Sequence, residues 1–181
     1  MALGTRNYIW QVSGYLQNEK ALNGFHHNQR LQVRSKKAAL IMLYKLWSGF
    51  TKNLRYLLVQ KCHLAVRIPR FGTFKRDAEG QEIAFTFLGS HELAQHIECS
   101  KMDDGEAFDL RSSQQGLATS PDWYRIAQVS EVQNGDVAKM LVQSILAVAV
   151  SHARDGNHVV LNMKVGQLTF MGCVVKFSST K

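Results

Sequence analysis

The sequence predicts an α+β fold made of two consecutive modules, each with two helices followed by a small antiparallel sheet. Two observations predict this architecture. The order helix, helix, three strands occurs twice in the 181 residues, on either side of a linker at 100–119 that is acidic and then rich in Ser, Gln and Gly. A five-residue pattern centred on Gly72 also recurs around Gly166. The hydrophobic fraction of 45% supplies enough apolar residues for a packed core.

Residues 1–34 are polar and basic, and we interpret them as an arm that is extended or partly helical. The arm has too few regularly spaced apolar residues for a core of its own, yet it carries Tyr8, Trp10, Tyr15 and Phe25. Ordering each residue costs about 1–2 kcal/mol of backbone entropy. We therefore expect the arm to become ordered on a partner and to contact other chains more than its own modules.

The first module is predicted over residues 35–99. Ser35 opens a helix over SKKAALIMLYK, and a second helix, capped by Ser48 or Thr51, runs to about Lys61. The segments HLAVRIP, TFKRD and EIAFTFL follow as strands, because their apolar residues alternate or they lie next to a turn. A short helix over HELAQHIE closes the module.

The second module is predicted over residues 120–181. Ser120 caps a short helix over DWYRIAQVS, with a proline at its first position. Asp136 or Asn134 caps a long helix to about Arg154, whose apolar residues recur at helical spacing. The segments VVLNMKV, QLTF and CVVKFS then form three strands.

The repeated pattern consists of RFGTF at 70–74 and KVGQL at 164–168, each reading basic, apolar, Gly, polar, apolar. We expect Gly72 and Gly166 to be structural turns at equivalent positions of the two sheets. The apolar parity changes at Gly166, which predicts a bulge or a sharp bend with a positive φ at this residue.

Positive charge is concentrated in the N-terminal half. Residues 1–76 hold fourteen Lys or Arg and a single acid, Glu19, whereas residues 77–181 hold eight Lys or Arg and thirteen acids. This asymmetry indicates an acidic partner, for which nucleic acid, an anionic membrane and the surface of tubulin all qualify. The candidate partner-binding residues are the following basic and aromatic side chains: Tyr8, Trp10, Arg30, Arg34, Lys36, Lys37, Arg67, Arg70, Lys75 and Arg76.

Several classes of function lack support in the sequence. No apolar run reaches the length of a membrane span, and three scattered cysteines are typical of free thiols in a reducing compartment. We find no phosphate loop, nucleophile motif, paired carboxylates or metal-ligand spacing. The sequence therefore predicts a protein that is not an enzyme, with no cofactor, no metal, no small-molecule substrate and no membrane partner.

The quoted segments carry a resemblance to a known fold. The stretches VRIPRFGTF at 66–74 and EIAFTFLGSHELA at 82–94, with DWYRIAQVSEVQNGDVAKMLVQSIL and VVLNMKVGQLTFMGCVVKF in the second half, resemble the bacterial histone-like HU/IHF fold. The order of the paired modules more closely resembles the tandem HU-like domains of the eukaryotic coiled-coil-domain-containing-81 family. One HU-like half is too small to bury a stable core alone, so the resemblance implies an intramolecular pseudo-dimer.

The resemblance also implies a function. Members of that family are associated with cilia, basal bodies and centrosomes, and such domains occur inside doublet microtubules. We therefore expect a non-catalytic structural protein of the ciliary or flagellar axoneme, located in the cytoplasm at the cytoskeleton, axoneme or basal body. Its partners are expected to be tubulin and other axonemal proteins.

The alternative is an HU-like architectural protein that binds nucleic acid. An HU-type grip on DNA needs a long basic β-arm and an apolar wedge, usually proline, that unstacks a base step. Here the first hairpin connection is only KRDAEGQ, and neither Pro69 nor Pro121 lies at an arm tip. We therefore expect nucleic-acid binding to be weak, sequence-independent and dependent on salt.

Overall fold

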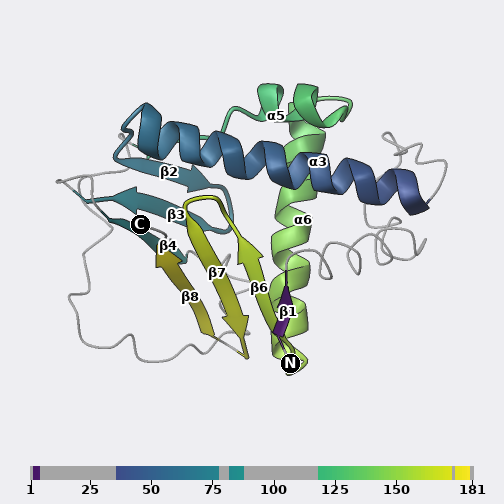
Figure 1. The fold of residues 1–181 in the computed structure, drawn as a ribbon, viewed down its shortest axis with the longest axis vertical. Helices are drawn as coiled ribbons and strands as arrows, with labels where there is room; N and C mark the ends of the chain where they lie inside the picture. Colours follow the sequence, from purple (N-terminus) through teal and green to yellow (C-terminus); the bar gives the residue numbers. More distant parts are fainter. Residues whose placement is uncertain (1, 5–35, 78–81, 88–117, 173, 180–181) are drawn as a thin grey trace.

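The computed structural model describes residues 2–4, 36–77, 82–87, 118–172 and 174–179. These residues form both helices and strands, which confirms the predicted α+β class (Figure 1). The elements are β1 (Ala2–Gly4), α3 (Lys36–Arg55), the π-helical turn η1 (Tyr56–Gln60), β2 (Ala65–Ile68), β3 (Gly72–Arg76), β4 (Ile83–Phe87), β5 (Ala118–Thr119), α5 (Trp123–Ser130), α6 (Gly135–Arg154), β6 (His158–Asn162), β7 (Gly166–Met171) and β8 (Val174–Ser179).

The first predicted helix pair is corrected, because α3 is a single helix that continues into η1. The proposed caps Ser48 and Thr51 both lie inside this helix, where the Thr51 hydroxyl donates to the Ser48 carbonyl at 3.3 Å. Buried Leu46, Phe50 and Leu54 continue the helical spacing across the expected break. Packing of this stripe outweighs the local tendency of Ser and Thr to start a new helix. The predicted short helix over HELAQHIE lies outside the described residues.

The two helices of the second module are confirmed, with one change of cap. The side chain of Asp122, rather than Ser120, accepts from the Arg125 amide at 3.0 Å and starts α5. Ser120 instead accepts a hydrogen bond from the Trp123 indole at 3.2 Å. Asn134, one of the two predicted alternatives, caps α6 by accepting from the Val137 amide at 3.0 Å.

Helix α6 is long and apolar enough to cross a membrane by length and composition, and it is the one described helix that is. Half of the 18-residue apolar stretch within this helix is buried inside the protein. Its buried residues, which include Leu141, Ile145 and Ala149, join the hydrophobic core, and α6 contacts β6 and β7. Packing against its own sheet is therefore a sufficient reason for its apolar character.

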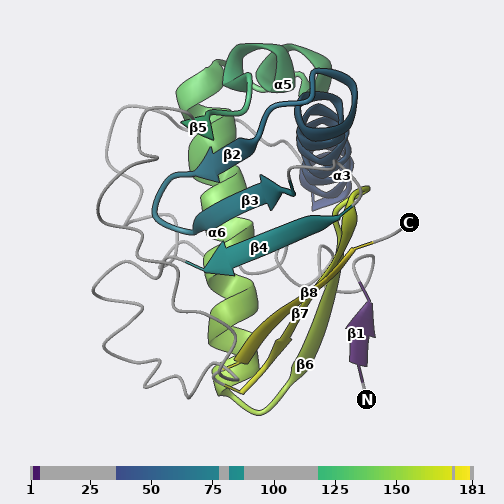
Figure 2. The ribbon, with the colours of Figure 1, turned by 90° about the vertical axis from the view of Figure 1, so that its left-hand side faces the viewer.

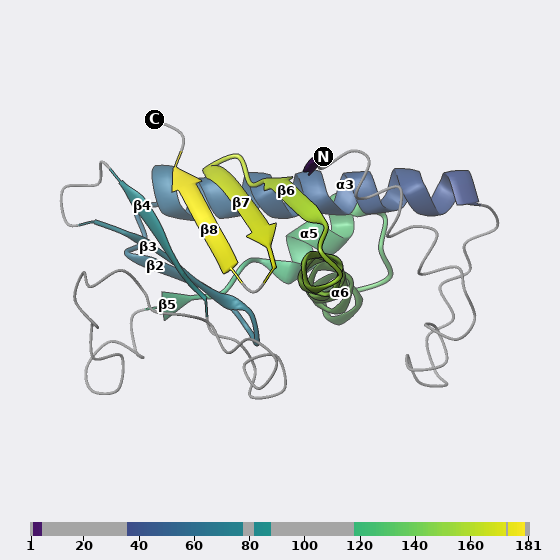
Figure 3. The same ribbon diagram turned by 90° about the horizontal axis from the view of Figure 1, so that it is seen from below.

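Each of the two sheets has the same plan. An antiparallel run of three strands, β2-β3-β4 or β6-β7-β8, carries a short parallel strand on the outer edge of its first member. Strand β5 pairs with β2, with Ala118 opposite Ala65, and β1 pairs with β6, with Ala2 opposite His158. The two sheets and their flanking helices are seen from two further directions in Figures 2 and 3.

The parallel additions cross between the modules. Strand β5 leads directly into α5 of the second module yet pairs with the sheet of the first, while β1 precedes the first module yet pairs with the sheet of the second. Residues 2–4 of the predicted arm therefore pair with a strand of their own chain, while the expectation that the arm contacts other chains more than its own modules stays a prediction. The remainder of the arm, 5–34, lies outside the described residues.

The two modules share one hydrophobic core. Buried residues of both belong to a single cluster, and edge strand β4 contacts edge strand β8. Five phenylalanines join the two modules: between ring centroids, Phe71 lies 6.2 Å from Phe170, and Phe74 and Phe85 lie 5.3 Å and 6.4 Å from Phe177. Because these rings are held in common, neither sheet would keep its apolar face covered without the other.

Two reciprocal hydrogen bonds also join the modules. The indole of Trp47 on α3 donates to the carbonyl of Asn162, before the β6–β7 turn, at 3.0 Å. The amide of Gln143 on α6 donates to the carbonyl of Pro69, in the β2–β3 turn, at 2.7 Å. Each long helix thus donates a side-chain hydrogen bond to a backbone carbonyl at or beside the first turn of the other module's sheet.

The predicted equivalence of the two glycines is confirmed, but not its cause. Gly72 and Gly166 are both the first residue of the middle strand of their sheet. The positive φ angles lie two residues earlier, at Arg70 (63°) and Lys164 (62°), so the expected positive φ at Gly166 is wrong. The backbone therefore bends in the turns before the strands, at Arg70 and Lys164. Glycine is required at 72 and 166 because Phe85 and Phe177 pack directly against these positions.

Candidate functional site

A basic groove lies between α3 and α5. Its volume is about 610 Å³. Helix α3 supplies most of one wall, and α5 the other. The lining residues are Tyr44, Lys45, Ser48, Gly49, Lys52, Asn53, Tyr56, Arg125, Ile126 and Val129.

Gly49 sets the distance between the two walls. A Cβ atom at this position would lie only 2.8 Å from a Val129 methyl group and 3.8 Å from the Ile126 carbonyl. The missing side chain lets α5 pack closely on α3, with Ile126 buried beneath the groove. Val129, by contrast, is 54% exposed and forms an apolar part of the surface.

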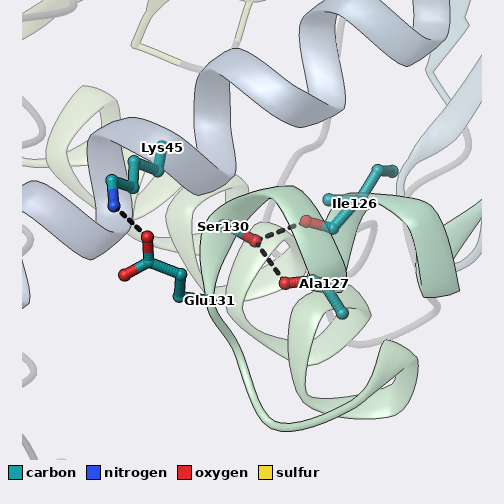
Figure 4. Close-up of polar contacts among 5 residues, drawn as sticks. All are labelled: Lys45, Ile126, Ala127, Ser130 and Glu131. Atoms are coloured by element: carbon teal, nitrogen blue, oxygen red, sulfur yellow. Dashed lines mark hydrogen bonds and ion pairs between the residues drawn. The ribbon is translucent and has the colours of Figure 1, made fainter.

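Polar contacts fix α5 on α3 at both ends. At the start of α5, the nearly buried side chain of Asn53 accepts from the Asp122 amide at 3.1 Å. At its end, Lys45 reaches from α3 to form an ion pair with Glu131 (Figure 4). The buried hydroxyl of Ser130 donates to the Ile126 and Ala127 carbonyls, also drawn in Figure 4, so its polar group is satisfied within the helix.

The charge of the groove is positive. Three of its lining residues, Lys45, Lys52 and Arg125, carry positive charge, and none of its lining residues is acidic. Glu131 offsets Lys45 at one end, while Lys52 and Arg125 are exposed on opposite walls. An anion in the groove would therefore meet cations from two different helices.

At the other end of the groove, two cations lie near the ring of Tyr56. The Arg125 guanidinium and the Lys61 ammonium both lie 5.7 Å from the centre of the Tyr56 ring. Such cation–π contacts hold the long basic side chains near the ring. Tyr56 therefore positions Arg125 at the groove, where its charge faces solvent.

Among the residues predicted to bind a partner, those whose side chains the structure describes do not line this groove. Tyr8, Trp10, Arg30 and Arg34 lie outside the described residues. Lys36 and Lys37 are the first residues of α3, and their side chains are likewise outside the described set.

The remaining predicted residues gather on the first sheet. Arg67 is exposed on β2, opposite Thr73, and Arg70 is exposed in the following turn. Lys75 and Arg76 are half-buried at the end of β3. The structure thus brings these four cations to one sheet and its first turn, apart from the groove.

The groove cations were missed by sequence reasoning. Lys45, Ser48 and Lys52 follow one another at spacings of a helical face, as does Tyr56, so a polar stripe on α3 was readable from the sequence. The presence of Arg125 beside this stripe could not be predicted, because only the packing of α5 onto α3 brings it there.

The β3–β4 and β7–β8 hairpins are the places where the expected HU resemblance would put DNA-gripping arms. Between β3 and β4 the Asp77 amide donates to the Glu82 carbonyl at 3.0 Å, which closes the connection immediately beyond the strands. Strands β7 and β8 are joined so tightly that Met171 pairs with Val174. Among the described residues of these hairpins, the strands do not continue as a long paired arm beyond Asp77 and Glu82 or beyond Met171 and Val174.

No group of three or more His, Cys, Asp or Glu side chains able to hold a metal ion occurs among the described residues. The chain matches no protein family model, and a comparison with curated proteins finds no significant match.

Proposed function

We propose that this chain is a non-catalytic structural protein that binds the acidic surfaces of other proteins. The observation that carries the proposal is the groove between α3 and α5, in which Lys52 and Arg125 present positive charge from two walls beside an exposed apolar side chain, Val129. Mixed charge and apolar surface of this kind is typical of protein–protein contacts.

The cellular setting comes from the resemblance to tandem HU-like domains of ciliary proteins. On that basis we propose that the partners are tubulin and neighbouring proteins of the axoneme, with attachment to doublet microtubules. The excess of Lys and Arg in residues 1–76 supports an acidic partner such as the tubulin surface.

We further propose that the two halves are HU-like modules that form a pseudo-dimer. Three features support this finer description: the crossed addition of β1 and β5, the reciprocal bonds from Trp47 and Gln143, and the matched glycines Gly72 and Gly166. In each case a feature of the first module has a counterpart in the second, as expected for two copies of one unit packed as a pair.

The alternative is an architectural nucleic-acid-binding protein, favoured by the basic N-terminal half alone. The short β3–β4 and β7–β8 connections weigh against it, because they offer no long arm for wrapping a duplex.

The location of a fluorescently tagged full-length protein in ciliated cells tests the proposal. We expect the protein along the axoneme or at the basal body, and retained there after detergent extraction. Accumulation in the nucleus or in an organelle nucleoid would favour the nucleic-acid alternative instead.

A further inference from the structure

We infer that the groove between α3 and α5 binds a short acidic peptide segment that carries one bulky apolar side chain among its carboxylates. This inference rests on the proposed function, because it takes the partner to be a protein. It adds the chemistry of the segment that is recognised and the residues that recognise it.

The charge of the groove selects carboxylates. Lys52 on α3 and Arg125 on α5 are both exposed, and the lining residues include no acid that would compete for them. Lys45 is already paired with Glu131, but both side chains are well exposed, at 41% and 75%. Exposed ion pairs contribute little to stability, so an incoming carboxylate can replace Glu131 at modest cost.

The apolar part of the groove selects one larger side chain. Val129 is 54% exposed although one of its methyl groups packs close to Gly49 of α3. The half-buried Tyr44 lines the same groove. An apolar or aromatic side chain of the peptide would cover Val129 and remove its surface from water.

The tyrosine geometry favours a peptide over a nucleic acid. Single-stranded nucleic acid gains much of its binding energy by stacking bases on aromatic rings. The Tyr56 ring is already engaged by Arg125 and Lys61, each 5.7 Å from its centre. The two cations beside Tyr56 remain available to carboxylates, whereas a base stacked on the ring would have to compete with both of them.

The size of the groove fits a few residues. A volume of about 610 Å³ lies within the range of roughly 300–1,000 Å³ that holds ligands of drug size. A short linear segment therefore fills it, whereas a folded domain would contact it only at one edge.

Fluorescence anisotropy with the full-length protein and labelled ten-residue peptides tests the inference. The probe is a glutamate-rich peptide with one central phenylalanine, compared with versions in which glutamine replaces every glutamate or serine replaces the phenylalanine. We expect the probe to bind, with affinity that falls as salt rises, and each altered peptide to bind at least about tenfold more weakly.

Protein variants locate the binding. We expect Lys52→Glu and Arg125→Glu each to weaken probe binding at least about tenfold, whereas the matched reversals Arg154→Glu and Lys176→Glu, exposed on α6 and β8, leave it unchanged. Val129→Ser should weaken binding of the phenylalanine probe but not of its serine version. Circular dichroism confirms that each variant is folded, and Arg125→Gln provides a milder change at the same position.

Equal losses from the groove and control reversals would overturn the inference, as would equal binding of the glutamate and glutamine peptides. A labelled single-stranded oligonucleotide that binds more tightly than the probe, and through Lys52 and Arg125, would also overturn it. If no peptide binds but the protein still occupies the axoneme, the inference fails and the proposed function stands. If the probe binds through the groove but the protein is nuclear, the proposed location fails alone.

Discussion

At the residue scale, the two matched glycines are explained by what lies against them. A Cβ atom on Gly72 would lie 2.5 Å from Phe85 Cζ, and one on Gly166 would lie 2.5 Å from Phe177 Cζ. Each would also approach a backbone carbonyl, of Thr86 or of Ser178, at 2.6 or 2.3 Å. A phenylalanine of the third strand therefore lies across each glycine, and the same solution occurs in both sheets.

Replacing Gly166 should destabilise the fold through this contact. The Ser178 carbonyl lies on the paired strand β8 and cannot retreat without disturbing the pairing of β7 with β8. We expect Gly166→Ala to lower the free energy of unfolding by about 2–3 kcal/mol, measured by urea denaturation. Gly172→Asn is the control, because this site has open space and Asn tolerates its φ of 57°. Equal losses from both substitutions would contradict the steric explanation.

At the scale of elements, local signals and packing contribute differently. Turn chemistry and short-range pattern predicted the strands around Gly72 and Gly166 and narrowed the cap of α6 to Asn134 or Asp136, but they placed the cap of α5 at Ser120 and not at Asp122. The continuity of α3 across Ser48 could not be predicted in this way, because it depends on the burial of Leu46 and Phe50 in the core. The groove was hidden for the same reason: it exists only where α5 meets α3, and its walls come from distant parts of the chain.

Gly49 offers a test of how closely these helices approach. A methyl group here would lie 2.8 Å from Val129 Cγ2, yet alanine is better than glycine in a helix by roughly 0.8–1.0 kcal/mol. We expect Gly49→Ala to destabilise the native protein slightly, because Val129 must move. In a Val129→Ala background the same change should stabilise by up to about 1 kcal/mol, as thermal or urea unfolding would show. A stabilising effect in both backgrounds would mean that the two side chains do not compete.

At the scale of the whole molecule, the described modules are not two independent domains joined by a linker. The short strand before each module pairs with the sheet of the other, and each long helix donates a hydrogen bond to the other module. Phe71, Phe74, Phe85, Phe170 and Phe177 form a shared cluster. Sequence patterns could reveal the repeated unit but not this exchange. The strands β1 and β5 are only three and two residues long and carry no periodicity of their own.

The central claim is that this basic molecule recognises acidic protein surfaces and not DNA. Co-sedimentation with taxol-stabilised microtubules, run beside a gel-shift assay with duplex DNA at increasing salt, tests it most directly. We predict binding to microtubules that persists near 0.15 M salt. DNA binding should be weak, should show no bending of the duplex, and should fall steeply between about 0.05 and 0.2 M salt. Tight binding of bent DNA at the higher salt, with no protein in the microtubule pellet, would contradict the claim.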